Sequence, residues 1–247
     1  MLVIDEAGTR AALPWAPLIG AIRECFCEGC EAPAKHEHFI EVPGETDAKL
    51  LLMPAWQTGD YVAVKIATLF PGNSAREMAA VNANMLLLSA KTGEILASID
   101  GGELTARRTA AASALAADYL ARPDAHHLLV IGTGRIAANL PEAYSAVRPI
   151  EHVSVWGRDP AKAERLAETF ANGVPVTDLA AAVSAADIVS TATLAQMPVL
   201  EGEWLSPGTH VDLIGNYSPE SREADDEVMR RGNVFIDDAA TLKSPGI

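Results

Sequence analysis

The chain has little positive charge, few aromatic residues and few cysteines. Its 247 residues include 19 Lys and Arg against 33 Asp and Glu, which gives a formal net charge of −14, and only 5% are aromatic. A surface this acidic argues against binding to nucleic acid or to an anionic membrane. No apolar run approaches the ~20 residues of a membrane span. The first residues also lack the basic region and long apolar core of a signal peptide, so a cytoplasmic protein is expected.

The three cysteines, Cys25, Cys27 and Cys30, all lie in one short segment. A zinc site there would need a fourth ligand, for which His36 and His38 are near enough, but the spacing matches no common structural zinc pattern. The odd number of cysteines also argues against a disulfide framework. Free thiols are therefore expected, and no metal site is predicted.

An apolar run rich in β-forming residues ends directly in Gly132-x-Gly134-x-x-Ala137, and a helix-forming sequence follows. The first glycine permits a tight turn, the second lets the backbone approach a pyrophosphate, and the third small residue lets the helix pack closely. Glycine-rich turns also occur in ordinary loops, but the strand before and the helix after favour a dinucleotide site. Pro141 is expected to kink that helix. The predicted cofactor-binding residues of this loop are Gly132, Thr133, Gly134, Arg135 and Ile136.

The next predicted strand, residues 152–156, ends in Trp156-Gly157-Arg158-Asp159. A site that prefers NAD usually has an acidic residue at the end of this strand to bind the ribose hydroxyls. Here a cation comes first, and Arg158 can form a bidentate contact with a 2′-phosphate, so NADPH is favoured. Two alternatives stay open: Arg158 is simply a solvated residue, or Asp159 reaches the ribose and the cofactor is NADH.

The remaining pattern predicts an α/β protein with two domains. Residues 1–122 combine helices with short strand candidates, which predicts an α+β domain, and from residue 123 onward strand and helix candidates alternate, which predicts a Rossmann-type doubly wound parallel sheet. Helices are expected near residues 15–27, 105–120, 178–185 and 224–231. Strands are expected near residues 39–42, 49–53, 61–68, 83–89, 95–99, 126–131, 152–156, 174–176, 188–191, 209–214 and 234–237.

Several segments, in this order, resemble the ornithine cyclodeaminase/mu-crystallin family, from about Leu50 to Leu242. They are residues 53–55, 64–73, 92–97, 104–114, 191–193, 208–215 and 218–227. So many ordered matches are more specific than the glycine loop alone. The resemblance implies a homodimer whose first domain binds a small amino or imino acid and forms the dimer contact, while residues 123–247 bind NAD(P).

The resemblance also implies roles for individual residues. Lys65 and Arg108 correspond to the family's substrate-site cations, and we predict them to be catalytic. Lys35 lies near the position where many members carry an Arg for the substrate carboxylate, although Lys cannot reproduce the bidentate geometry of Arg. The stretch that opens with Arg108 and Thr109 is expected near the cofactor phosphates. Thr191 and Thr193 are also predicted to bind the cofactor.

Two departures from the family bear on the activity. Cyclodeaminases resemble Gly-Gly-Asp-Cys-Pro where this chain has Ile214-Gly-Asn-Tyr-Ser-Pro219, so that Tyr217 replaces the Asp that handles the amine proton. Asp225 and Asp226 are candidates to replace that acid, but we interpret them as residues at a helix N-terminus. The chain also stops where a family member continues, and that further segment normally completes the first domain.

These features favour an NAD(P)H-dependent imino-acid reductase. The expected reaction converts Δ1-pyrroline-2-carboxylate or Δ1-piperideine-2-carboxylate to L-proline or L-pipecolate, a step of proline metabolism. A protonated ring nitrogen makes the adjacent carbon electrophilic, and a cationic clamp on the carboxylate fixes one ring face. Two alternatives remain: an ornithine cyclodeaminase-type lyase that retains NAD and releases ammonia, and a non-catalytic NADP-binding protein.

Overall fold

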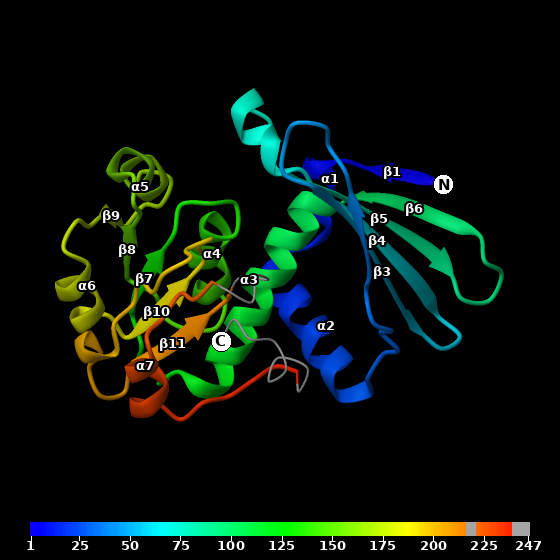
Figure 1. Ribbon diagram of the computed structural model, residues 1–247. Coiled ribbons are helices and arrows are strands. Elements are labelled where there is room, and N and C mark those ends of the chain that lie inside the picture. Colours follow the sequence, from blue (N-terminus) through cyan, green and yellow to red (C-terminus); the bar gives the residue numbers. More distant parts are fainter. Residues whose placement is uncertain (216–220, 239–247) are drawn as a thin grey trace. The chain divides into compact units, whose positions relative to one another are not determined.

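The computed structural model describes residues 1–215 and 221–238, and the chain separates into two compact units, Met1–Arg108 and Thr109–Ile247 (Figure 1). Helix α3 (Gly101–Leu120) begins in the first unit and continues into the second. Among the described residues, no helix has both the length and the apolar character to cross a membrane.

The first unit is built on one six-stranded sheet in the order β1-β6-β5-β4-β3-β2. Only the edge pair β1·β6 is parallel, and the other neighbours are antiparallel, as expected for strands joined by short turns. The strands are β1 (Leu2–Ile4), β2 (His36–Ile40), β3 (Ala48–Gln57), β4 (Tyr61–Leu69), β5 (Val81–Ser89) and β6 (Ile95–Asp100). A 3-10 helix, η1 (Pro71–Arg76), joins β4 to β5.

Three helices belong wholly or partly to this unit: α1 (Glu6–Ala12), α2 (Trp15–Glu28) and the start of α3. Asp5 caps α1 by accepting a hydrogen bond from the amide of Gly8, and Asp100 accepts one from the amide of Glu103 at the start of α3. The capping residue places the start of α3 at Gly101, four residues earlier than the apolar pattern predicted. Both β1 and α1 were absent from the sequence-based prediction; β1 has only three residues, two of them exposed, and so carries no periodic signal.

The second unit contains a five-stranded parallel sheet in the order β11-β10-β7-β8-β9. In chain order this is the 3-2-1-4-5 arrangement of a Rossmann-type sheet, and the strand order reverses between β7 and β10. The predicted fold class is therefore confirmed. The strands are β7 (His127–Ile131), β8 (His152–Trp156), β9 (Gly173–Pro175), β10 (Ile188–Thr191) and β11 (His210–Leu213).

The central strand β7 is covered on both faces. Residues Leu128–Ile131 have no exposed surface. Leu129 and Ile131 belong to a core cluster with Val183 of α6 (Leu179–Ala185) and Val228 of α7 (Asp226–Arg231). A strand buried on both faces is apolar at every position, which is why this run was readable in the sequence.

The helix after the glycine loop is shorter than the sequence suggested. A 3-10 turn, η2 (Ala137–Asn139), leads into α4 (Leu140–Ser145), and Pro141 lies in the first turn of α4. A proline is well accommodated there because its missing N–H would have no intrahelical partner. Pro141 therefore starts a helix and does not kink a longer one.

One predicted strand is absent from the described residues. Residues 234–237 form no strand, and Val234, Phe235 and Ile236 are exposed by 40% or more. The composition of this segment favours a strand, but within the described part of the chain it has no neighbouring strand to pair with, and a strand needs that pairing. The prediction was wrong for that reason.

Candidate active site

The carboxyl ends of β7 and β10 meet where the strand order of the parallel sheet reverses. The amide of Ala192 donates to the carbonyl of Ile131 at 2.8 Å, and the amide of Gly132 donates to the carbonyl of Trp156 at 2.9 Å. These bonds join the loops that follow β7, β8 and β10 along one edge of the sheet. Ligands of open α/β sheets bind at such an edge.

The two glycines of the loop differ in what surrounds them. Gly132 is buried with φ +133°, and a Cβ atom at this position would overlap the carbonyl oxygen of Ala192. Gly134 is exposed, and a Cβ atom there would meet nothing within 4 Å. Gly132 is therefore required by the protein's own packing. Gly134 leaves open space beside the backbone, which is what close approach of a phosphate needs.

The end of β8 contacts this loop. A Cβ atom at Gly157 would lie 2.6 Å from Cγ2 of Thr133, so the glycine at the end of β8 lets the loop pack closely. Arg158 follows and is exposed. The carboxylate of Asp159 caps α5 (Pro160–Ala167) by accepting from the amide of Ala161 at 3.0 Å, and more weakly from that of Lys162. At the end of β8, Arg158 is thus exposed, whereas the carboxylate of Asp159 is engaged in a helix cap.

The two threonines predicted after β10 are held by a buried glutamate that the sequence analysis missed. Oε1 of Glu223 accepts from the amide and the hydroxyl of Thr193, both at 2.7 Å. Its Oε2 accepts from the hydroxyl of Thr191 at 2.7 Å and from the amide of Gly215 at 2.8 Å. Thr191 is fully buried. Glu223 was hidden in the sequence because its segment has no periodic apolar pattern that marks it as buried.

A second, half-buried carboxylate ties the sheet to helix α4. Oδ2 of Asp212 in β11 accepts from the hydroxyl of Tyr144 at 2.9 Å and from that of Ser190 at 2.6 Å. Burial, and then the charge of Asp212, raise the pKa of Tyr144 well above its usual value. Tyr144 therefore acts as a neutral hydrogen-bond donor that fixes α4 to the sheet.

In the first unit, Lys65 lies in the middle of β4, half-buried, between Met53 of β3 and Met85 of β5. Burial, and then the positive charge of Arg108, lower the pKa of Lys65 to about 8. A lysine in this state loses its proton as the pH rises through about 8, well below the pH at which a surface lysine does so. The structure thus brings together the two cations that the sequence singled out.

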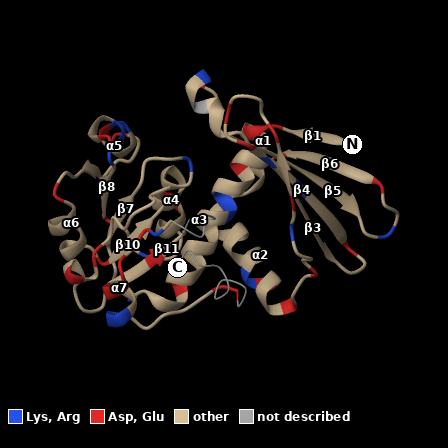
Figure 2. Ribbon diagram, viewed as in Figure 1, with Lys and Arg blue, Asp and Glu red and all other residues tan. Residues whose placement is uncertain are grey.

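Arg108 lies exposed on α3. Nearby, Asp100 caps α3, and the buried carboxylate of Glu103 on the same helix lies 3.0 Å from Nε of Arg10 and 3.9 Å from Nη1 of Arg107. Figure 2 shows the basic stretch within this helix.

Two other predicted residues have distinct environments. Lys35 is exposed and directly precedes β2, where His36 pairs with Leu52. It therefore lies at the end of the cross-strand row that contains Met53 and Lys65, two strands away, or ~10 Å by the usual strand spacing. Thr109 on α3 is buried, and its hydroxyl has no hydrogen-bond partner among the described residues.

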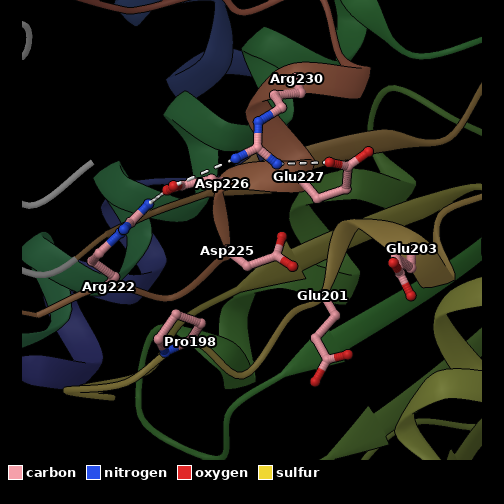
Figure 3. Close-up of a pocket in the computed structure, with 8 residues that line it drawn as sticks. All are labelled: Pro198, Glu201, Glu203, Arg222, Asp225, Asp226, Glu227 and Arg230. Atoms are coloured by element: carbon pink, nitrogen blue, oxygen red, sulfur yellow. Dashed lines mark hydrogen bonds and ion pairs between the residues drawn. The ribbon is translucent and has the colours of Figure 1, made fainter.

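The acidic candidates Asp225 and Asp226 border an open hollow of about 550 Å³ beside α7 (Figure 3). Asp225 caps α7 by accepting from the amide of Val228 at 3.1 Å, and Asp226 forms an ion pair with Arg222. Their interpretation as residues at a helix N-terminus is confirmed. Five carboxylates and two arginines line the hollow, an excess of negative charge that disfavours an anionic substrate. Tyr217 lies outside the described residues.

The sequence profile of the ornithine cyclodeaminase/mu-crystallin family matches residues 15–247. The chain belongs to this family. It is 45% identical over 203 residues to a Delta(1)-pyrroline-2-carboxylate reductase of Paracoccus denitrificans, a match that covers 80% of this chain and 64% of that protein. Members of the family are NAD(P)-dependent imine reductases and cyclodeaminases, as the resemblance implied.

Two solved structures show the same fold. The Delta(1)-pyrroline-2-carboxylate reductase of Thermococcus litoralis, in complex with NADH and L-proline, is 31% identical, with a TM-score of 0.83 over 94% of this chain and 74% of that one. An archaeal alanine dehydrogenase dimer with bound NAD is 27% identical, with a TM-score of 0.86 over 99% of this chain and 76% of that one. This chain thus spans about two thirds to three quarters of the length of these relatives.

Proposed function

We propose that this protein reduces a cyclic imino acid, Δ1-pyrroline-2-carboxylate or Δ1-piperideine-2-carboxylate, to L-proline or L-pipecolate with NAD(P)H. The observation that carries the proposal is the pair Lys65 and Arg108, in which burial and a neighbouring cation lower the pKa of Lys65 to about 8. A half-buried cation beside another cation is unfavourable unless an anion binds there. A substrate carboxylate is such an anion, and the reductases among the relatives act on substrates that carry one.

Arg108 is proposed to bind the substrate carboxylate, because its planar guanidinium can donate two parallel hydrogen bonds. Lys65 is proposed to hold a proton near the ring nitrogen, since a pKa of about 8 allows it to donate and recover a proton at neutral pH. Lys35, at the end of the same row, adds positive charge to the substrate region. These roles favour binding and protonation of the imine over elimination of ammonia.

The cofactor is proposed to lie along the carboxyl edge of the parallel sheet. The open space beside Gly134 and the close packing of Gly132 and Gly157 fit a dinucleotide backbone. Thr133, Arg135 and Ile136 complete the loop, with Thr109 as a further proposed contact. Thr191 is buried and would act through its main chain, whereas Thr193 is half-buried. The bound nicotinamide supplies the hydride that the electrophilic carbon accepts.

The preference for NADPH rests on Arg158. Asp159 is the residue that would favour NADH, but its carboxylate accepts a hydrogen bond from the amide of Ala161 and so caps α5. We expect Arg158→Ala to raise the Kd of NADPH about tenfold or more and to leave that of NADH within twofold. Arg165→Ala, which removes an exposed cation from the same helix, is the matched control. Equal effects on both cofactors would contradict the assignment.

The reaction is tested by absorbance at 340 nm with each cofactor and each imino acid, and by ammonia release from L-ornithine. We expect oxidation of NAD(P)H with an imino acid and no ammonia from ornithine. Ammonia release without net oxidation would identify the cyclodeaminase-type lyase. Cofactor binding without turnover of any of these compounds would identify a non-catalytic protein.

A homodimer is also proposed, with the first unit at the contact. Its sheet exposes several large apolar side chains: Leu2, Val3, Phe39, Tyr61, Val81 and Ile95. They lie on five strands and at both ends of the sheet, and exposed apolar side chains of this kind are candidates for burial at an association surface. Light scattering is expected to give twice the 26.0 kDa mass of one chain, and a monomer across the micromolar range would contradict the proposal.

A further inference from the structure

Glu223 is a buried carboxylate in the second unit, with 4% of its surface exposed. Its two oxygens accept four hydrogen bonds, from Thr191, from the amide and hydroxyl of Thr193, and from the amide of Gly215. Burying a carboxylate costs several kcal/mol unless such partners compensate. All four partners follow or end a strand of the parallel sheet, so the carboxylate joins the carboxyl ends of β10 and β11.

The main chain that carries Glu223 is fixed independently. Its carbonyl accepts from the amides of Val199 and Leu200 at 2.9 and 3.0 Å, and Leu200 forms a parallel bridge with Ala224. The amide of Asp225 in turn donates to the carbonyl of Leu200 at 3.0 Å. The side chain of Glu223 is therefore held at both ends, by its own main chain and by the hydrogen bonds of its carboxylate.

Through its bonds to Thr191 and Thr193, Glu223 supports the segment that packs against Gly132 of the glycine loop. Between Thr191 and Thr193 lies Ala192, whose carbonyl oxygen a Cβ atom at Gly132 would overlap. The adenosine half of a dinucleotide belongs to the β8 side of the glycine loop, because the residue that binds its ribose follows that strand. The nicotinamide half therefore belongs to the β10 side, where Glu223 acts.

We propose that Glu223 is a positioning residue that holds residues 191–193 at the end of β10 and Gly215 after β11 in the conformation that binds the nicotinamide half of the cofactor. This inference rests on the proposed function. Glu223 touches neither substrate nor cofactor in this account. It acts through Thr193, Ala192 and Gly215, whose backbone it fixes.

The hydrogen-bond pattern explains why a carboxylate is required. Each oxygen of Glu223 faces one backbone N–H, that of Thr193 at Oε1 and that of Gly215 at Oε2. A glutamine has one oxygen and one NH₂ group, so either orientation places NH₂ against a backbone N–H. The threonine hydroxyls can rotate, but the backbone amides cannot. Glu223→Gln therefore disturbs one of the two loops although its size is unchanged.

The test compares binding of the whole dinucleotide with binding of its adenosine fragment, by calorimetry. The ligands are NADPH and adenosine 2′,5′-bisphosphate, or NADH and AMP if the wild type prefers NADH. We expect Glu223→Gln to raise the Kd of the dinucleotide about tenfold or more and that of the fragment less than twofold. Thr193→Val, which removes one of the four bonds to Glu223 together with the bond from the amide of Ala195 to the Thr193 hydroxyl, is expected to show a smaller effect in the same direction, about threefold.

Glu201→Gln is the matched control, since Glu201 is an exposed carboxylate in the neighbouring segment. It is expected to leave both affinities unchanged. If Glu223→Gln does not fold, as judged by circular dichroism, Thr193→Val carries the test. Equal weakening of dinucleotide and fragment, or no weakening in the variant that is tested, would overturn the inference and leave the proposed function standing. Failure of the wild type to bind either dinucleotide would overturn both.

Discussion

Lys65 is the residue on which the proposed chemistry depends most. It lies half-buried in the central part of a sheet, and its pKa is lowered to about 8 by burial and by Arg108. In the unfolded chain a lysine has a pKa near 10.5. Folding therefore forces a charged group into a less favourable environment at neutral pH, by ~1.36 kcal/mol for each pKa unit. A residue that lowers stability in this way is explained by function.

We predict that Lys65→Met stabilises the protein and abolishes turnover. Methionine fits between Met53 and Met85 and removes the buried charge, so the free energy of unfolding at pH 7 is expected to rise by about 2 kcal/mol. Chemical denaturation and the 340 nm assay measure the two effects. Lys49→Met, which removes a lysine paired with Glu37 on the neighbouring strand, is the control and should change stability by less than ~1 kcal/mol. A destabilised Lys65→Met protein, or one with normal turnover, would speak against the account.

The same pKa predicts two opposite trends with pH. Carboxylate binding requires protonated Lys65, so the affinity for L-proline should be constant below about pH 7 and fall as the pH rises through about 8. The unfolded chain binds more protons than the folded chain between about pH 8 and 10.5, so Lys65 makes stability increase over that range. Calorimetric titration and denaturation across pH 6–10 would show both trends. Neither trend should appear in Lys65→Met; an unchanged profile in that variant would assign the titration to another group.

At the residue scale, the sequence located the cations but not what surrounds them. Lys65 and Arg108 came from a family resemblance, and their proximity became visible only through the fold. Glu223 was not found, because a glutamate in an irregular segment looks the same whether it is exposed or buried. Asp159 was weighed as a ribose ligand, and only its hydrogen bond to the amide of Ala161 shows its other use.

At the scale of the element, the glycine loop after β7 separates a folding requirement from a binding requirement. Gly132 has a positive φ angle and no room for a Cβ atom, whereas Gly134 has neither restriction. A consensus of glycines in a sequence does not distinguish the two. The structure does, and it predicts that the same substitution has different consequences at the two positions.

We predict that Gly132→Ala destabilises the protein by about 2–4 kcal/mol, because the methyl group meets the Ala192 carbonyl and the backbone is strained. Gly134→Ala should leave the free energy of unfolding within ~0.5 kcal/mol and raise the Kd of the cofactor about tenfold or more, since the methyl group occupies the space a phosphate needs. Denaturation and calorimetry measure both. Unchanged cofactor binding by Gly134→Ala would remove this loop from the site.

Strands were predicted correctly where the local sequence favours an extended backbone and a neighbouring strand is present. The prediction was wrong where no such neighbour exists among the described residues. Strands β8 and β10 have the bounds that the sequence predicted, because both are short runs of residues that favour strands, His152-Val-Ser-Val-Trp156 and Ile188-Val-Ser-Thr191. Residues 234–237 have a similar composition, but no strand forms there among the described residues. Composition reports a preference for extended backbone; it does not report whether a neighbouring strand exists.

At the scale of the whole molecule, we propose that the two units have different roles. The chain folds as two compact units, one carrying the cation pair and the other the dinucleotide-type sheet. We propose that the N-terminal domain, predicted as residues 1–122, binds the substrate, and that residues 123–247 bind the cofactor. The family and the fold class were predictable from ordered motifs. The size of the substrate ring was not, since one methylene is worth only ~1–3 kcal/mol in an apolar pocket.

The central claim is tested most directly by the stoichiometry of a single reaction. The protein is incubated with NADPH and Δ1-pyrroline-2-carboxylate, and in parallel with NADH; cofactor oxidation is followed at 340 nm and proline is quantified by chiral chromatography. The account predicts one L-proline formed for each cofactor oxidised, with NADPH preferred. Folded protein that oxidises neither cofactor, or that yields no L-proline, would contradict it.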